Sequence, residues 1–191
     1  MVRNRTVWVT AALLTATLGA AAVPAVAAPA AAPRAAAACP TGWGSLAKTN
    51  WSMTSGEYIT NARTGRHDCY DRFVVDVPGA DAAELGYTVH YVDQLIQDPS
   101  GVPIPVGGGA ILEVIVRAPG YNPDTGAPTY PGRAGQALPG VNLTGYRTFR
   151  DAKYAGSFEG QSQFGLGVRA RLPFRVLQLD GHLVVDVAHT W

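Results

Sequence analysis

The chain has 191 residues, of which 47% are hydrophobic and 15% are charged, and its formal net charge at pH 7 is +1. A chain of this length and composition can bury one hydrophobic core, and it is too short for a second full domain beside it. Its nearly neutral charge excludes the strongly basic proteins that bind nucleic acid through phosphate contacts.

Residues 1–27 have the pattern of a secretory signal peptide. Arg3 and Arg5 form a positive segment, an uncharged apolar run follows at 7–23, and the tripeptide AVA at 25–27 is a small-x-small cleavage site. The apolar run is too short and too interrupted for a stable membrane span. Removal of 1–27 leaves 13 Lys and Arg against 14 Asp and Glu, a net charge of −1. The sequence therefore predicts an exported protein of the cell envelope or the exterior.

The predicted folded domain covers 39–191, after an Ala/Pro-rich linker at 28–38. Its two cysteines, Cys39 and Cys69, are the only ones in the chain, and an even number in an exported protein predicts one disulfide. The alternative is a lipid anchor on Cys39, because the preceding "AAAC" resembles a lipobox. The disulfide is favoured, since the usual upstream leucine is missing and Cys39 lies well beyond the apolar run.

Alternation of apolar and polar side chains predicts a series of short strands. In the first, Phe73, Val75 and Val77 share one face. The predicted strands cover 70–77, 87–95, 110–118, 146–153, 164–171, 174–179 and 183–187. Helical periodicity is absent apart from one or two turns at 79–86, and 118–140 is a long loop rich in Gly and Pro. The fold class is therefore all-β, a small antiparallel β-sandwich.

The tetrapeptide VVDV occurs twice, at 74–77 and at 184–187, near the two ends of the predicted domain. In a sandwich the first and last strands often lie close together. We therefore expect the valines to fill the inner face and the intervening Asp76 and Asp186 to face solvent.

Catalytic constellations are missing from the sequence. The histidines are His67, His90, His182 and His189, without an HExxH motif. Ser157 lies in "GSFEG", where a nucleophile elbow would need G-x-S-x-G. The acid pairs Asp76 with Asp186 and Asp151 with Glu159 are ordinary outward strand carboxylates. We expect neither enzymatic activity, nor a metal, nor a cofactor.

Binding is the remaining function, and the chain's 13 arginines against 2 lysines suggest where it occurs. Guanidinium groups form bidentate contacts with carboxylates and phosphates, and the rings of Tyr91, Tyr146 and Phe149 offer faces for sugars. The candidate ligand-binding residues are Arg63, Arg66, His67, Tyr91, Arg150, Glu159, Arg169 and Arg171. The alternative is that these arginines pair with surface acids.

The sharpest expectation concerns the stretch "GLGVRARLPF" at 165–174, interpreted as one strand. Arg169 and Arg171 then share the outward face with Gly165 and Gly167, whose missing side chains leave the backbone open. Such a face would form a shallow cationic groove for a carboxylate-bearing polymer.

Five segments resemble the AMIN-like domain of exported bacterial proteins and lipoproteins. They are "RTGRHDCYDRFVVDV", "GYTVHYVDQL", "VPIPVGGGAILEVIV", "AGSFEGQSQFGLGVRARLPFRVLQLD" and the terminal "HLVVDVAH". This family is related to the AMIN domain of N-acetylmuramoyl-L-alanine amidases, and the resemblance covers roughly 39–191. It implies a small β-sandwich and, by analogy, a non-catalytic module that binds peptidoglycan or another wall polymer. The alternative is a structural or protein-interaction domain that recruits or regulates an envelope enzyme.

Overall fold

The computed structural model describes residues 38–52 and 56–191, and the predicted signal peptide and nearly all of the predicted linker lie outside them. The described residues form eleven strands. Their bounds are β1 (Lys48–Asn50), β2 (Asn61–Arg66), β3 (Tyr70–Asp76), β4 (Tyr87–Val92), β5 (Leu95–Gln97), β6 (Val102–Ile104), β7 (Ala110–Val116), β8 (Phe149–Phe158), β9 (Gln161–Val168), β10 (Phe174–Leu179) and β11 (His182–Ala188).

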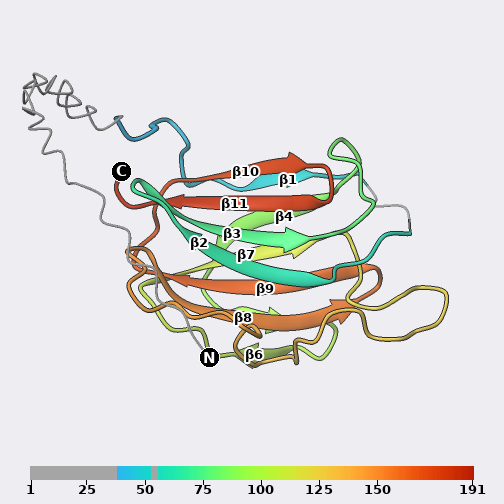
Figure 1. Cartoon of the computed structure of the whole chain (residues 1–191). Helices are drawn as coiled ribbons and strands as arrows, with labels where there is room; N and C mark the ends of the chain where they lie inside the picture. The colour runs from blue at the N-terminus through green and yellow to red at the C-terminus, as the bar shows by residue number, and fades with distance from the viewer. Residues whose placement is uncertain (1–37, 53–55) are drawn as a thin grey trace, which may run out of the picture. The chain divides into compact units, whose positions relative to one another are not determined.

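Two antiparallel sheets pack against each other, which confirms the predicted sandwich (Figure 1). The larger sheet has the order β1-β4-β7-β9-β8 and the smaller one β10-β11-β3-β2, while β5 and β6 form a separate hairpin. Apolar side chains from both sheets meet in one core, where the rings of Phe73 and Phe164 lie 5.4 Å apart in an edge-on arrangement. Such edge-on pairs add to the stabilisation from buried area.

The two VVDV segments lie on neighbouring strands. β3 and β11 pair antiparallel, with Val74 opposite Val184 and Phe73 opposite Val185. Phe73 and Val185 are fully buried in the core, as alternation predicted. The expectation for Asp186 was wrong, because its side chain is completely buried on the outer side of the sheet. Arginines on both neighbouring strands, Arg72 and Arg175, cover it.

Several predicted strands differ from the observed ones at their ends. The predicted strand 87–95 is two strands, β4 and β5, and the predicted strand 146–153 begins only at Phe149. β1, β2 and β6 were missed because they are short or, like β2 with the sequence NARTGR, mostly polar. β2 tolerates this composition because it lies at the edge of its sheet, where one side faces solvent.

The predicted long loop is confirmed, since 117–148 contains no strand. It takes part in two isolated bridges, Tyr121 with Pro128 inside the loop and Ala137 with Lys153 of β8. Tyr130 and Leu138 are buried in the core, so the loop covers one part of the sandwich.

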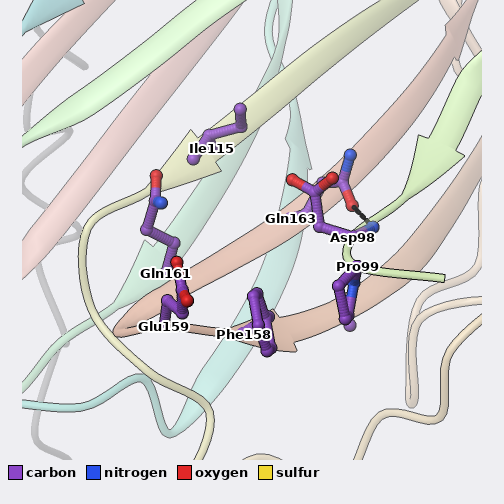
Figure 2. Close-up of a pocket in the computed structure, with 8 residues that line it drawn as sticks. Asp98, Pro99, Ile115, Phe158, Glu159, Gln161 and Gln163 are labelled. Carbon is purple, nitrogen blue, oxygen red and sulfur yellow. Dashed lines mark hydrogen bonds between the residues drawn. The ribbon is translucent and has the colours of Figure 1, made fainter. Parts of the chain in front are cut away.

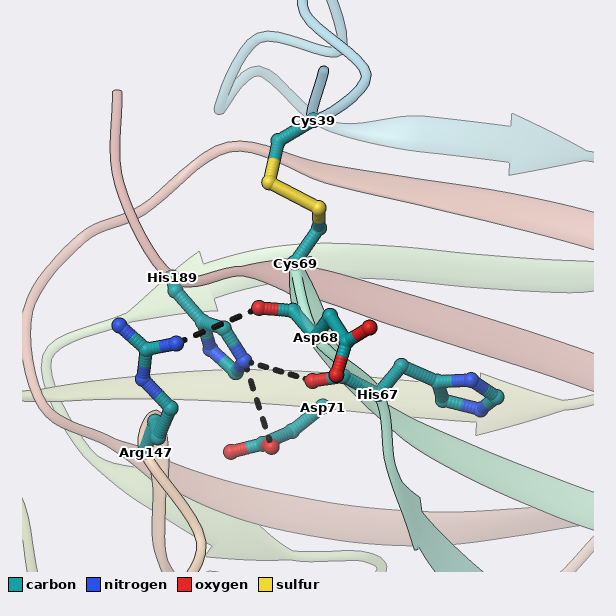
Figure 3. Close-up of a disulfide and its surroundings, with 7 residues drawn as sticks. All are labelled: Cys39, His67, Asp68, Cys69, Asp71, Arg147 and His189. Carbon is teal, nitrogen blue, oxygen red and sulfur yellow. Dashed lines mark hydrogen bonds and ion pairs between the residues drawn. A yellow bond between two sulfur atoms is a disulfide. The ribbon is translucent and has the colours of Figure 1, made fainter. Parts of the chain in front are cut away.

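The predicted disulfide between Cys39 and Cys69 is present and closes a sequence separation of 30 residues (Figure 3). It attaches the start of the described chain to the turn between β2 and β3. No helix among residues 38–52 and 56–191 has the length and hydropathy that crossing a membrane would require.

Candidate functional site

The eight candidate ligand-binding residues do not form one site, because most of them have structural partners. Arg63 on β2 forms a bidentate pair with Asp76, with Nε 3.1 Å from Oδ2 and Nη2 3.0 Å from Oδ1. Asn61 and His182 contact the same carboxylate. The guanidinium of Arg63 is therefore already occupied by a carboxylate of the protein itself.

His67 lies in the turn between β2 and β3, directly after Arg66 (Figure 3). Its ring stacks on Tyr70 at 4.5 Å, and its carbonyl oxygen accepts a hydrogen bond of 3.0 Å from Nε2 of His189. Arg147 donates to the carbonyl of Asp68 in the same turn. Together with the disulfide, these contacts hold the turn against the end of β11.

Arg150 stabilises the turn that precedes β8. Its guanidinium donates to the backbone carbonyls of Tyr146, Arg147 and Phe149 at 3.0 to 3.1 Å. Phe149 is 1% exposed, so the expectation that its ring stacks on sugars was wrong. It lies on the inner face of the sandwich because β8 begins at this residue.

The strand predicted at 165–174 ends at Val168, and the chain turns before β10 begins at Phe174. Val168 and Leu172 are buried as expected, but the two arginines contact different parts of the molecule. Arg169 donates to the carbonyl of His189 at the end of the chain, whereas Arg171 extends over the ring of Tyr91.

The face of β9 that was expected to be open is closed. A Cβ added to Gly165 would lie 2.4 Å from the side chain of Leu95, and one added to Gly167 would lie 1.7 Å from the carbonyl oxygen of Gly107. These glycines allow β5 and the segment before β7 to pack directly on β9. Their function is therefore close packing rather than ligand access.

Arg171 and Tyr91 meet at a surface hollow of about 450 Å³. We call it the Arg171 hollow; it is lined by Tyr91, Val92, Asp93, Val106, Gly108, Gly109, Ala110, Ile111 and Arg171. The guanidinium carbon of Arg171 lies 5.0 Å from the centre of the Tyr91 ring. Its only hydrogen bond within the described residues is a long contact of 3.5 Å to the carbonyl of Ser45. Arg171 is exposed, so its charge faces solvent.

Tyr91 is held rigidly under this arginine. Its hydroxyl donates to the carbonyl of Leu172 at 2.8 Å and accepts from the N–H of the same residue at 3.0 Å. Burial raises the pKa of Tyr91 to about 12, against the opposing effects of the Leu172 hydrogen bond and the Arg171 charge. At neutral pH the ring is a fixed, uncharged platform.

Gly108 and Gly109 of the "GGG" segment at 107–109 also line the hollow, and sequence reasoning missed them. Gly108 has φ 131°, and a Cβ on Gly109 would lie 2.2 Å from the carbonyl oxygen of Arg169. Three consecutive glycines between two strands were the available signal for a close backbone approach. Asp93 adds one carboxylate to the rim.

Metal chemistry has no support in the described part of the chain, which holds no group of three or more His, Cys, Asp or Glu side chains able to bind an ion. One ionic group joins Asp186 to Arg72 and Arg175, at distances of 2.7 and 2.9 Å. Because all three side chains satisfy one another, this group is structural.

Glu159 lies away from the Arg171 hollow, in the two-residue turn between β8 and β9, where it lines a different pocket. Of the predicted site residues, Tyr91 and Arg171 line the Arg171 hollow, whereas Arg66 is exposed at the end of β2 beside His67 and lines neither pocket.

Among the comparisons with known proteins, the one with family models found a match. No curated protein and no solved structure is similar enough to this chain to count as a match. The family model described as the AMIN-like domain matches residues 57–189, which include ten of the eleven strands and the Arg171 hollow. The chain thus belongs to the AMIN-like domain family.

Proposed function

We propose that this protein is a non-catalytic module of the cell envelope that binds the carboxylate-bearing stems of peptidoglycan through the Arg171 hollow. Membership of the AMIN-like family suggests an envelope- or wall-associated module, and the family is generally non-catalytic. A disulfide is consistent with an extracytoplasmic location, because cytosolic thiols are kept reduced.

One observation carries this proposal, the free guanidinium of Arg171. Arg63 is paired with Asp76, and Arg150 and Arg169 are bonded to backbone carbonyls. Arg66 is exposed and also has no hydrogen bond among the described residues, but it does not line the Arg171 hollow. Arg171 keeps nearly all of its N–H donors for a ligand. A guanidinium binds a carboxylate through two parallel hydrogen bonds, which gives direction as well as affinity.

The surroundings of Arg171 suit a ligand that combines a carboxylate with a sugar or an aliphatic chain. The lining of the hollow includes the ring of Tyr91 and the backbone of Gly108 and Gly109. Tyr91 is fixed by Leu172, so little conformational entropy is lost when a ligand packs on its ring. The same ring can pack against a sugar or an aliphatic stem.

The test is cosedimentation of the oxidised protein with isolated sacculi. We expect Arg171→Ala to weaken binding at least several-fold with an unchanged melting temperature, because exposed charges typically contribute only about 0–1 kcal/mol to stability. Arg133→Ala is the matched control, since Arg133 is an exposed arginine in the 117–148 loop. Equal binding by both variants would rule out the Arg171 hollow as the wall site.

A protein-interaction module remains the second candidate, and one observation favours it. Leu46 and Trp51 flank β1 and are 77% and 74% exposed. β1 is the edge strand of the larger sheet, where a partner strand can add. This alternative predicts no sedimentation with pure sacculi, but binding in whole-envelope extract that is lost in a Leu46→Ser, Trp51→Ser double variant.

A further inference from the structure

A second pocket lies between the β5–β6 hairpin and the turn that joins β8 to β9 (Figure 2). Its volume is about 240 Å³, and it shares no lining residue with the Arg171 hollow. The side chains that give it its character are Asp98, Pro99, Phe158, Glu159, Gln161 and Gln163. Glu159 and Gln161 lie on one side, Asp98, Pro99 and Gln163 lie on the other, and Phe158 lies between them.

The carboxylates of Asp98 and Glu159 both lack a cation. In the described part of the chain, neither forms an ion pair or a side-chain hydrogen bond, and both residues are exposed. Asp98 follows β5 and Glu159 follows β8, so neither lies in a strand. Other exposed acids outside the strands, such as Asp124, also lack an ion pair among the described residues, but Asp98 and Glu159 line the same pocket. The pocket therefore carries uncompensated negative charge.

One wall of the pocket is rigid. The side chain of Gln163 is buried and donates to Glu113 at 2.6 Å and to the carbonyl of Ile96 at 2.7 Å. Its oxygen accepts from the N–H of Asp98 at 3.3 Å. These bonds fix the backbone of the segment after β5 on β9 before any ligand arrives.

The remaining lining is apolar. Phe158 is 40% exposed, and Ile115 forms part of the lining between the two acidic sides. An aromatic ring near carboxylates is suited to an organic cation, which the ring face attracts as well.

The turn between β8 and β9 has an unfavourable backbone conformation at Glu159. Glu159 has φ 47°, a left-handed conformation in which side chains other than those of Asn, Asp and Gly are uncommon. The next residue, Gly160, is in the same region with φ 76°. A glutamate at the first position of such a turn is not explained by folding preference.

We propose that this pocket binds a primary alkylammonium group, as in a lysine-type side chain. The ammonium lies between Asp98 and Glu159, and the methylene chain packs on Phe158 and Pro99. The volume is below that of pockets for drug-sized ligands, so it suits one such group rather than a whole oligomer. This inference does not depend on the proposed function of the Arg171 hollow.

The test is a titration of the ¹⁵N-labelled oxidised protein, followed by backbone amide shifts. The probe is Nα-acetyl-lysine methylamide, and the control ligand is Nα-acetyl-norleucine methylamide, which has the same chain without the ammonium. We expect saturable shifts at Asp98, Phe158, Glu159 and Gln161 with the first ligand only. Equal shifts with norleucine, or no saturable shift, would overturn the proposal.

The variants separate a specific site from general attraction to acids. Asp98→Asn with Glu159→Gln should weaken lysine-probe binding by at least about tenfold, because two charge contacts are lost. Asp124→Asn, an exposed carboxylate in the 117–148 loop, should leave it unchanged. Phe158→Ala should also weaken it, which tests the pocket without changing charge. Unchanged binding in the double variant, or equal loss in Asp124→Asn, would contradict the site.

Discussion

Arg72 of β3 and Asp186 of β11 form a bidentate ion pair across neighbouring strands, although 114 residues separate them in sequence. The bonds are 2.7 Å from Nε to Oδ1 and 2.9 Å from Nη2 to Oδ2. The hydrogen bonds that Arg72 donates to Asp186 raise the pKa of the guanidinium above its usual value. Arg175 donates to the same carboxylate from β10, so Asp186 connects three strands.

Replacement of Asp186 by Asn should destabilise the protein strongly. It leaves two partly buried guanidinium groups facing a neutral amide, and removal of one partner from a buried ion pair typically costs about 3–5 kcal/mol. Because the arginines are 26% and 32% exposed, we expect a loss of about 2–4 kcal/mol in urea unfolding. Asp124→Asn is the control and should change stability little. A loss as small as that of the control would show that the Asp186 group contributes nothing net.

Asp76 predicts a pH dependence of stability. Burial alone would raise its pKa, but hydrogen bonds from Arg63 and Asn61 and the charge of Arg63 bring the pKa below its usual value. A lowered folded-state pKa gives stability that is present above the unfolded value of about 3.9 and is lost as pH falls through the folded value. The difference in urea midpoint between the wild type and Asp76→Asn should therefore shrink below about pH 4. A constant difference down to pH 2 would contradict this assignment.

The Cys39–Cys69 disulfide should contribute substantially to stability. The two cysteines are separated by 30 residues in sequence. On the chain-entropy model, a disulfide that closes a loop of this length raises the free energy of unfolding by roughly 3–4 kcal/mol. We expect the Cys39→Ser, Cys69→Ser double variant to lose about that amount in urea unfolding. Thiol titration of the denatured, unreduced protein should find no free thiol; two thiols, or a diacylglycerol on Cys39, would contradict the bond.

Gly167 should not tolerate a side chain. A methyl group there would meet the backbone oxygen of Gly107 at 1.7 Å, and backbone cannot move aside as a flexible side chain does. We expect Gly167→Ala to cost at least about 2 kcal/mol or to prevent folding. Gly65→Ala on the edge strand β2 is the control, since its nearest neighbour would be 3.7 Å away. Equal melting temperatures for the two variants would show that the segment before β7 does not pack on β9 as described.

Tyr91→Phe should affect both stability and alkaline titration. The substitution leaves the N–H and carbonyl of Leu172 without their partner, at a cost of about 1–3 kcal/mol. The folded pKa of about 12 lies above the ordinary tyrosine value, so this stability is present below about pH 10 and is lost as pH rises through 12. The difference in phenolate absorbance between wild type and Tyr91→Phe should therefore develop near pH 12. A difference that develops near pH 10 would show that Tyr91 is solvated.

The sequence predicted the sandwich, the disulfide and the neighbouring ends of the domain because these depend on alternation and on cysteine count. The core positions of Phe73 and Val75 follow directly from period-two patterning. The candidate site depended instead on a single strand continuing from 165 to 174, which would have placed Arg169 and Arg171 on one face. The chain turns at Arg169, so the strand that would have aligned Arg169 with Arg171 ends before them. Pro173 also interrupts it, because proline has no backbone N–H.

Local sequence also does not show whether an arginine side chain is already paired with another group of the protein. Whether Arg63, Arg72 or Arg171 is free depends on acids many residues away, such as Asp186. The glycines at 165 and 167 were correctly assigned to one face, but their neighbours belong to β5 and to the segment before β7. Long-range partners therefore decide which arginines can bind a ligand.

The pairing of β3 with β11 also determines when the domain can fold. The smaller sheet has β11 between β10 and β3, so the β2–β3 hairpin has no partner on its β3 side until the last residues of the chain are present. During synthesis, the β2–β3 hairpin emerges first and keeps an unpaired edge until 182–188 have also emerged. Proteins with many contacts between residues far apart in sequence, such as those between β3 and β11, fold slowly. Loss of even the C-terminal ten residues should leave β3 as an exposed edge that pairs with other chains.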